Sequence, residues 1–268
     1  MDKFTEINFL TRSLQENLSL SPSDKIHLAL MEKVLRQTSK LPFIFKGGSA
    51  LLFCYGLNRF SEDLDFDCAK RINPRSCITE AVKVLNSTAS LIRNSQQINL
   101  LSMDVPKDTE TTSRYMVRYV FTMKNQEVFS SSLKLEISHR NELISTKNIE
   151  KFINKEKAFN VYKLEYLLEN KLICIGAFPE ISEGRSQIRD LYDVAFISQH
   201  YPKIFSFRQA KALSMVCKNL DKLTSQFHPS FIEDKIVNKI TDLDSLVLKL
   251  AENSEKVLKL QQDKYLER

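Results

Sequence analysis

The sequence feature that most constrains the fold is the segment of residues 43–67, FIFKGGSALLFCYGLNRFSEDLDFD. Its first three residues form a short apolar run that is typical of a strand. The two glycines that follow predict a tight turn. Ser49 fits the N-cap of a short helix, which Gly56 would end. The backbone amides at such a helix start can bind an anion such as phosphate.

Aspartates alternate with apolar residues at the end of this segment, in residues 63–67 (DLDFD). In a strand, Asp63, Asp65 and Asp67 share one face and the apolar residues share the other. Same-face residues lie roughly 6.6 Å apart, and carboxylates at this spacing can converge on two metal ions about 3.5–4 Å apart. The alternative is a strand with one solvated polar face. The glycine-serine turn just upstream favours the metal site.

The combination of GGS and SEDLDFD resembles the nucleotidyltransferase superfamily with the polymerase-β-type core. More narrowly, residues 46–67 (KGGSALLFCYGLNRFSEDLDFD) resemble the DUF1814 group. This group includes the AbiEii-type toxins of bacterial abortive-infection and toxin–antitoxin systems. Weaker similarity lies near Glu136 and in residues 171–193.

The resemblance implies a transfer of a nucleotide from an NTP to a hydroxyl, assisted by Mg²⁺, with two ions as one possibility. Asp63 and Asp65 would be catalytic residues and metal ligands. A third acid is expected on a neighbouring strand, and Glu136 fits because it lies on the polar face of the alternating run 132–139. Many family members have Asp at this position. The alternative for Glu136 is an ion pair with Lys134 or with an adjacent strand.

The resemblance also implies a nucleotide-binding set upstream of the aspartates. The glycine turn would bind phosphates through backbone amides, a serine would add its hydroxyl, and a lysine would add a point charge at the triphosphate. A second serine matches the S-x-D pattern of the toxin group. These residues are Lys46, Gly47, Gly48, Ser49 and Ser61.

A second block of the toxin group is similar to Lys171 together with the run RDLYD. In that group a helical Lys and a following Asp face the cleft, which makes Lys171, Asp190 and Asp193 candidate catalytic residues. The insertion between the lysine and the run is longer than expected, so the choice between the two aspartates stays open. Ordinary charges on a helix surface are the alternative.

Composition narrows the class of protein. The 268 residues include 43% hydrophobic residues and carry a net charge of +6, a mild excess that suits a polyanionic partner. The five cysteines form no C-x-x-C pair, which argues against a disulfide framework or structural zinc and fits a reducing cytosol. A polar N-terminus and the lack of an apolar run of roughly 20 residues predict a cytoplasmic protein without a membrane segment.

The pattern along the chain predicts an α+β fold: a nucleotidyltransferase-type mixed sheet flanked by helices, followed by a C-terminal helical bundle. The expected domains are residues 1–157 and 158–268. Strands are expected at 98–105, 114–123 and 132–139, a loop at 106–113 and a turn at 124–126. Helices are expected within 1–20 and over 22–39, 74–93, 162–177 and 186–200.

The acceptor is expected to be RNA, in particular a tRNA 3′ end, because the chain is basic and because members of the toxin group modify tRNA. Seven basic residues also accumulate across the expected domain junction. The alternative is that they only form a solvated linker and helix face. They are Arg140, Lys147, Lys151, Lys155, Lys157, Lys163 and Lys171. An antitoxin protein is a possible partner. The alternatives are a small-molecule nucleotidyltransferase of the antibiotic-modifying kind and a catalytically inactive nucleic-acid-binding protein.

Overall fold

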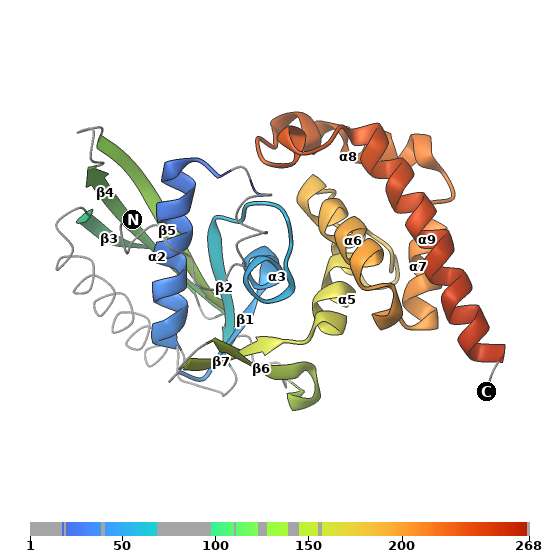
Figure 1. Cartoon of the computed structure of the whole chain (residues 1–268), viewed down its shortest axis with the longest axis horizontal. Coiled ribbons are helices and arrows are strands. Elements are labelled where there is room, and N and C mark those ends of the chain that lie inside the picture. Colours follow the sequence, from blue (N-terminus) through green and yellow to red (C-terminus); the bar gives the residue numbers. More distant parts are fainter. Residues whose placement is uncertain are drawn as a thin grey trace. The chain divides into compact units, whose positions relative to one another are not determined.

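The computed structural model describes residues 18, 20–38, 41–68, 98–109, 111–122, 128–138, 145–154 and 157–266 (Figure 1). The helix predicted over 74–93 and the turn at 124–126 lie outside these residues, and so does nearly all of the helix predicted within 1–20. The chain divides into two compact units, residues 1–163 and 164–268. The fold is mixed α+β, as predicted.

The first unit contains a seven-stranded sheet with the strand order β3-β4-β5-β2-β1-β7-β6. The pairs β2–β5 and β1–β7 are parallel, whereas the other neighbours are antiparallel, so the sheet is mixed. The strands are β1 (Phe43–Lys46), β2 (Asp63–Cys68), β3 (Ile98–Asp108), β4 (Thr112–Thr122), β5 (Val128–Ser138), β6 (Ile149–Asn154) and β7 (Lys157–Tyr162). The 3₁₀ turn η1 (Thr146–Asn148) precedes β6.

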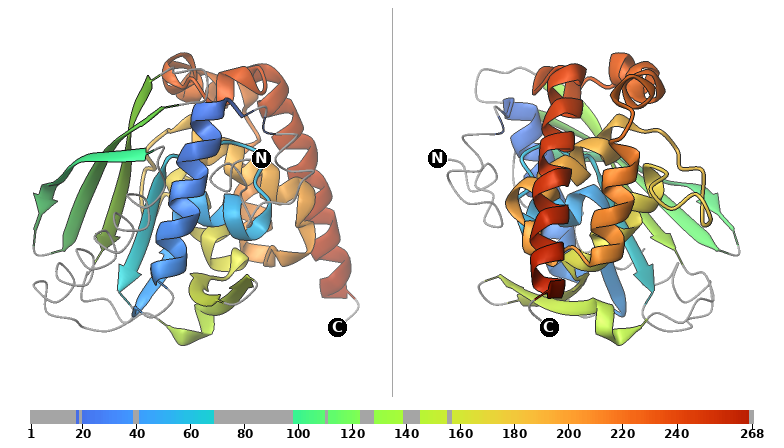
Figure 2. Two further views of the ribbon diagram at one scale, coloured as in Figure 1. Left: turned by 60° about the vertical axis from the view of Figure 1, so that its left-hand side comes forward. Right: turned by 90° about the vertical axis from the view of Figure 1, so that its right-hand side faces the viewer.

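Two helices, α2 (Pro22–Thr38) and α3 (Gly47–Tyr55), contact the strands of this sheet (Figures 1 and 2). On the apolar face, the ring of Phe45 contacts Phe53 of α3 and Phe66 of β2. Because these rings lie on one face of the sheet, the opposite face carries the alternating aspartates.

The predicted start of α2 is confirmed: the Asp24 amide donates to Ser21 Oγ and the Ser21 amide donates to Asp24 Oδ2, each over 3.1 Å.

The predicted N-cap of α3 is wrong. The helix begins at Gly47, so Ser49 is its third residue, and the preceding residue with extended backbone is Lys46. Gly47 has a φ of +76°, which lets the chain turn from β1 directly into the helix. The predicted end is confirmed, because Gly56 closes the helix in the left-handed conformation with a φ of +75°.

Two further expectations about strands are wrong. The loop predicted over 106–113 is much shorter, because β3 continues to Asp108 and β4 starts at Thr112. The helical bundle was expected to begin at residue 158, yet β7 pairs with β6 in a hairpin and continues to Tyr162. Strand β7 is held there by parallel pairing with β1, in which Phe45 lies beside Val161.

The second unit is helical, and α9 packs against α6, α7 and α8 (Figure 2). Its helices are α5 (Leu164–Cys174), α6 (Ile188–His200), α7 (Phe207–Val216), α8 (Leu220–Glu233) and α9 (Leu243–Leu266), with 3₁₀ turns η2 (Pro202–Ile204) and η3 (Val237–Lys239). The units divide after Lys163, whereas the predicted domain boundary, after residue 157, falls within β7. Whether the second unit is an independent domain stays a prediction. None of the described helices is long and apolar enough to cross a membrane.

Candidate active site

A row of four charged residues crosses the sheet from β1 to β4. Lys46 lies opposite Asp65, Asp65 lies beside Glu136, and Glu136 lies opposite Arg114. Residues at the same register position of neighbouring strands project to the same face of a sheet. The row therefore places two carboxylates side by side, with a cation at each end.

The environment of Asp65 raises the pKa of its carboxyl group. Burial, followed by the negative charges of Asp63 and Glu136, raises this pKa to about 6 against the opposing effect of Lys46 and Lys134. A group in this situation is stabilised as an anion when a cation binds next to it. Carboxylate oxygens are also the ligands that Mg²⁺ prefers, so the residues present fit the metal that the family resemblance implies.

Asp63 and Glu136, the other two acids proposed as metal ligands, both pair with cations of the protein. Asp63 forms an ion pair with Lys134, which lies beside it in register on β5. Glu136 Oε2 accepts hydrogen bonds from Arg114 Nη2 and Nε over 2.6 and 2.9 Å. The expected alternative for Glu136, a pair with an adjacent strand, is thus present. Among the residues that the structure describes, no three acidic, histidine or cysteine side chains gather into a ready metal centre.

The glycine turn and the aspartate strand fit closely against each other. A Cβ atom at Gly47 would lie 2.6 Å from Asp65 Oδ2, so any side chain there would displace the carboxylate. A Cβ atom at Gly48 would lie 2.8 Å from Arg59 Nη2 and 3.0 Å from Ser61 Oγ. A side chain at either glycine would therefore require these neighbouring side-chain ends to move, and the start of α3 lies directly beside Asp65.

Ser49 links the helix to the aspartate strand. Its side chain is fully buried, its hydroxyl donates to the carbonyl oxygen of Asp63, and its Oγ lies 2.9 Å from Ser61 Oγ. The hydroxyl is thus engaged within the protein, where it holds the start of β2 against α3. Phosphate binding at this turn stays a prediction, and the backbone amides are its best candidates.

Lys46 belongs to a second polar group that crosses four strands. Its Nζ pairs with Asp67 Oδ1 and lies 3.2 Å from Ser138 Oγ, while Tyr162 donates to Asp67 Oδ2 over 2.8 Å. Sequence reasoning missed Arg114 and Tyr162 as members of this polar face. Lys134 was expected there as a possible partner of Glu136, but its ion pair is with Asp63.

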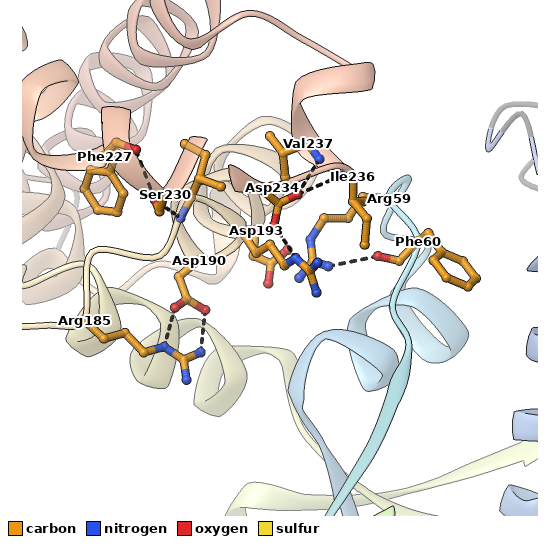
Figure 3. Close-up of polar contacts among 12 residues, drawn as sticks. Arg59, Phe60, Arg185, Asp190, Asp193, Phe227, Ser230, Asp234, Ile236 and Val237 are labelled. Atoms are coloured by element: carbon orange, nitrogen blue, oxygen red, sulfur yellow. Dashed lines mark hydrogen bonds and ion pairs between the residues drawn. The ribbon is translucent and has the colours of Figure 1, made fainter. Parts of the chain in front are cut away.

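A buried charge cluster lies in the second unit. Lys171 Nζ contacts Asp190 Oδ1 over 2.7 Å and Asp193 Oδ2 over 2.6 Å. The two aspartates are 1% and 0% exposed, so the alternative that they are ordinary helix-surface charges is wrong. Arg185 donates to both oxygens of Asp190 over 2.6 and 2.9 Å (Figure 3). Burial alone would raise the pKa of Asp190, but Lys171 and Arg185 together lower it to about 2.

The helix that carries these aspartates is anchored at its start. Ser230 accepts a hydrogen bond from the Ile188 amide over 3.0 Å and donates to the Phe227 carbonyl (Figure 3). Asp234 accepts hydrogen bonds from Arg189 and from the backbone amides of Ile236 and Val237, just after α8. The RDLYD run is therefore fixed against α8 and the segment after it.

The basic run at the unit boundary is only partly a basic surface. Lys147 and Lys151 are exposed and Lys163 is half-buried. Lys171 is buried between two aspartates, so its expected place in an exposed basic surface for RNA is wrong. Arg140 and Lys155, as well as the side chain of Lys157, lie outside the described residues.

Comparison with known proteins identifies the family. The sequence profile of the nucleotidyl transferase AbiEii toxins of type IV toxin–antitoxin systems matches residues 29–259. The crystal structure of JHP933 from Helicobacter pylori has 31% identity and a TM-score of 0.76, covering 93% of this chain and 97% of that one. A second H. pylori structure, described as a candidate nucleotidyltransferase, has 32% identity, a TM-score of 0.74, and coverage of 91% and 98%. A search of curated proteins finds no significant match.

Proposed function

The chain belongs to the AbiEii family of nucleotidyl transferase toxins, and we propose that it moves a nucleotide from an NTP to an acceptor hydroxyl with release of pyrophosphate. The observation that carries the proposal is the close fit of Asp65 against Gly47. It puts carboxylates suited to a metal beside a helix start suited to a phosphate. These are the two parts that phosphoryl chemistry on an NTP requires.

The bond that forms joins the acceptor oxygen to the α-phosphorus, and the bond that breaks releases pyrophosphate. Asp63 and Asp65 would hold Mg²⁺, and Glu136 would be the third ligand. Bound Mg²⁺, as one ion or two, would lower the pKa of the attacking hydroxyl and neutralise the triphosphate. The amides at the start of α3 would bind phosphate oxygens, and Lys46 would supply a positive charge at the edge of the site.

Lys171, Asp190 and Asp193 stay in the proposal as the second functional block. Their burial and mutual contacts support a fixed arrangement of one cation and two anions. Such an arrangement holds the lysine in one position, which a residue acting on a substrate requires. Ser61 supports the site through its contact with Ser49, next to the aspartate strand.

We propose RNA, and in particular a tRNA 3′ end, as the acceptor. The net charge of +6 and the exposed Lys147 and Lys151 support a polyanionic partner. The family is that of toxins in type IV toxin–antitoxin systems, so an antitoxin protein is a proposed partner. Action in the cytoplasm, where both NTPs and tRNA occur, belongs to the same proposal.

The test is incubation of the protein with Mg²⁺, total tRNA and each of the four NTPs labelled at the α-phosphate. Label in RNA with one or more NTPs is the expected result. Label in a small hydroxylated compound or in protein, with none in RNA, would replace the acceptor while keeping nucleotidyl transfer. RNA binding without any transfer would instead indicate an inactive nucleic-acid-binding protein.

A further inference from the structure

Lys134 and Arg114 form ion pairs with two of the carboxylates that are proposed to hold metal. Lys134 pairs with Asp63, and Arg114 pairs with Glu136 through two donors on one oxygen. Between 26% and 37% of each of these four side chains is exposed, so the pairs are reachable by a ligand.

The sheet itself specifies these two pairs. Asp63 and Lys134 share a register position in the parallel β2–β5 pair, and Arg114 and Glu136 share one in the antiparallel β4–β5 pair. Side chains at such positions lie close together on one face. The cations are therefore held at the acids by the backbone and are not chance contacts of long surface side chains.

A divalent ion and these two cations compete for the same oxygens. An ion that binds alone brings positive charge to a face that already holds Lys46, Lys134 and Arg114. Like charges at short range disfavour that state. An ion that arrives on a triphosphate also brings negative charge, on which a displaced lysine or arginine can form charge-assisted hydrogen bonds.

We propose that Lys134 and Arg114 are internal counter-ions that leave Asp63 and Glu136 when a metal–nucleoside triphosphate complex binds, and then bind its phosphates. This inference rests on the proposed function. Its consequence is that metal and nucleotide bind as a coupled pair. Because coupling between two ligands is reciprocal, each raises the affinity for the other by the same factor, which is typically about 5–150-fold.

The two cations then have opposite effects on the two ligands. They weaken the binding of metal alone, because they compete with it, and they strengthen the binding of the nucleotide, because they contact its phosphates. If they were ordinary surface pairs, their removal would change neither affinity by a measurable amount, since exposed ion pairs contribute little.

The experiment is calorimetric titration of the full chain with MgCl₂ alone, with the α,β-methylene analogue of each NTP in EDTA, and with each analogue in excess MgCl₂. The variants are Lys134→Met and Arg114→Gln, with Lys134→Arg as the charge-retaining variant. Arg208→Gln is the matched control. Arg208 forms an exposed ion pair with Glu180 over 3.1 Å, and both residues belong to the second unit, whereas the proposed metal site belongs to the first. Circular dichroism checks that every variant is folded.

In the wild type we expect at least a fivefold gain in analogue affinity from Mg²⁺. In Lys134→Met and Arg114→Gln, Mg²⁺ alone should bind severalfold more tightly, the analogue more weakly, and the coupling should shrink, while Lys134→Arg and Arg208→Gln keep it. Equal coupling in all folded variants, or weaker binding of Mg²⁺ alone in both charge-removing variants, would overturn the inference and leave the proposed function standing. A wild type that binds no analogue in any condition would overturn both.

Discussion

Asp65 and Glu136 lie side by side in the parallel strands β2 and β5, on the face of the sheet opposite the phenylalanine core. Two carboxylates in this position repel each other, and the pKa of Asp65 is raised to about 6, chiefly by burial and then by neighbouring acids. The arrangement costs stability in the metal-free protein. Its retention in the fold is understandable if a cation binds there.

Asp65→Asn should therefore raise the melting temperature of the metal-free protein at neutral pH. Because the folded-state pKa of Asp65 lies above its unfolded value near 3.8, stability falls as the pH rises between about 4 and 6. The asparagine variant lacks this loss. Its stability gain over the wild type should be present at pH 8, shrink below pH 6 and vanish near pH 4, as measured by thermal unfolding in EDTA.

Asp67→Asn is the contrasting variant, since the same substitution on the same strand removes a partner from Lys46. Its melting temperature at pH 8 should fall or stay level, because the ion pair is lost while the hydrogen bond from Tyr162 can remain. A rise equal to that of Asp65→Asn would show that crowding at Asp65 is not the cause.

Gly47→Ala should disable nucleotide and metal binding, because its Cβ atom would lie 2.6 Å from Asp65 Oδ2 and force the carboxylate to move. Gly56→Ala is a matched control: its φ of +75° nearly equals the +76° of Gly47, yet no atom lies within 4 Å of the added Cβ. Both variants should lose about 1–2 kcal/mol to backbone strain. Equal loss of NTP affinity in both titrations would contradict the role of the Gly47–Asp65 contact.

Ser49→Ala should destabilise the protein by about 1–3 kcal/mol, because the Asp63 carbonyl and the Ser61 hydroxyl lose a buried partner. Ser61→Ala should cost less, since Ser49 can still donate to Asp63. Urea unfolding without ligand measures both. The account of Ser49 fails if its alanine variant is as stable as the wild type, or less affected than Ser61→Ala.

Lys171→Met should lower the free energy of unfolding by about 3–5 kcal/mol, because it leaves two buried aspartates without their common cation. Asp190 would keep Arg185, but Asp193 would lose the lysine. The control is Arg208→Met, whose exposed ion pair should be worth about 0–1 kcal/mol. Denaturant unfolding that finds the two variants equally stable would refute a structural role for the cluster.

The parts of the site that follow from local pattern could be predicted from the sequence. Alternation placed Asp63, Asp65 and Asp67 on one strand face, and it placed Glu136 and Lys134 together on another. The end of α3 at Gly56 followed from the need for a left-handed residue there. These features depend on residues within one turn or one strand, so a short window contains the information.

The parts that depend on pairing between distant segments could not be predicted. Nothing in the sequence near Arg114 indicates that it lies opposite Glu136, because the register of β4 against β5 sets that contact. The same holds for Tyr162, which reaches Asp67 only because β7 pairs with β1. Ser49 looked like a helix cap because its preference for that role is strong, but the glycine turn starts the helix three residues earlier, with Lys46 in the cap position.

The central claim is that the protein catalyses nucleotidyl transfer with metal that the β2 carboxylates Asp63 and Asp65 bind. The most direct test is the transfer of α-labelled phosphate from NTPs to tRNA in Mg²⁺ by the wild type, Asp63→Asn and Asp65→Asn, with folding checked by circular dichroism. The account predicts transfer by the wild type that EDTA abolishes, and a loss of at least about 100-fold in each folded variant. Near-wild-type transfer by either variant would contradict it.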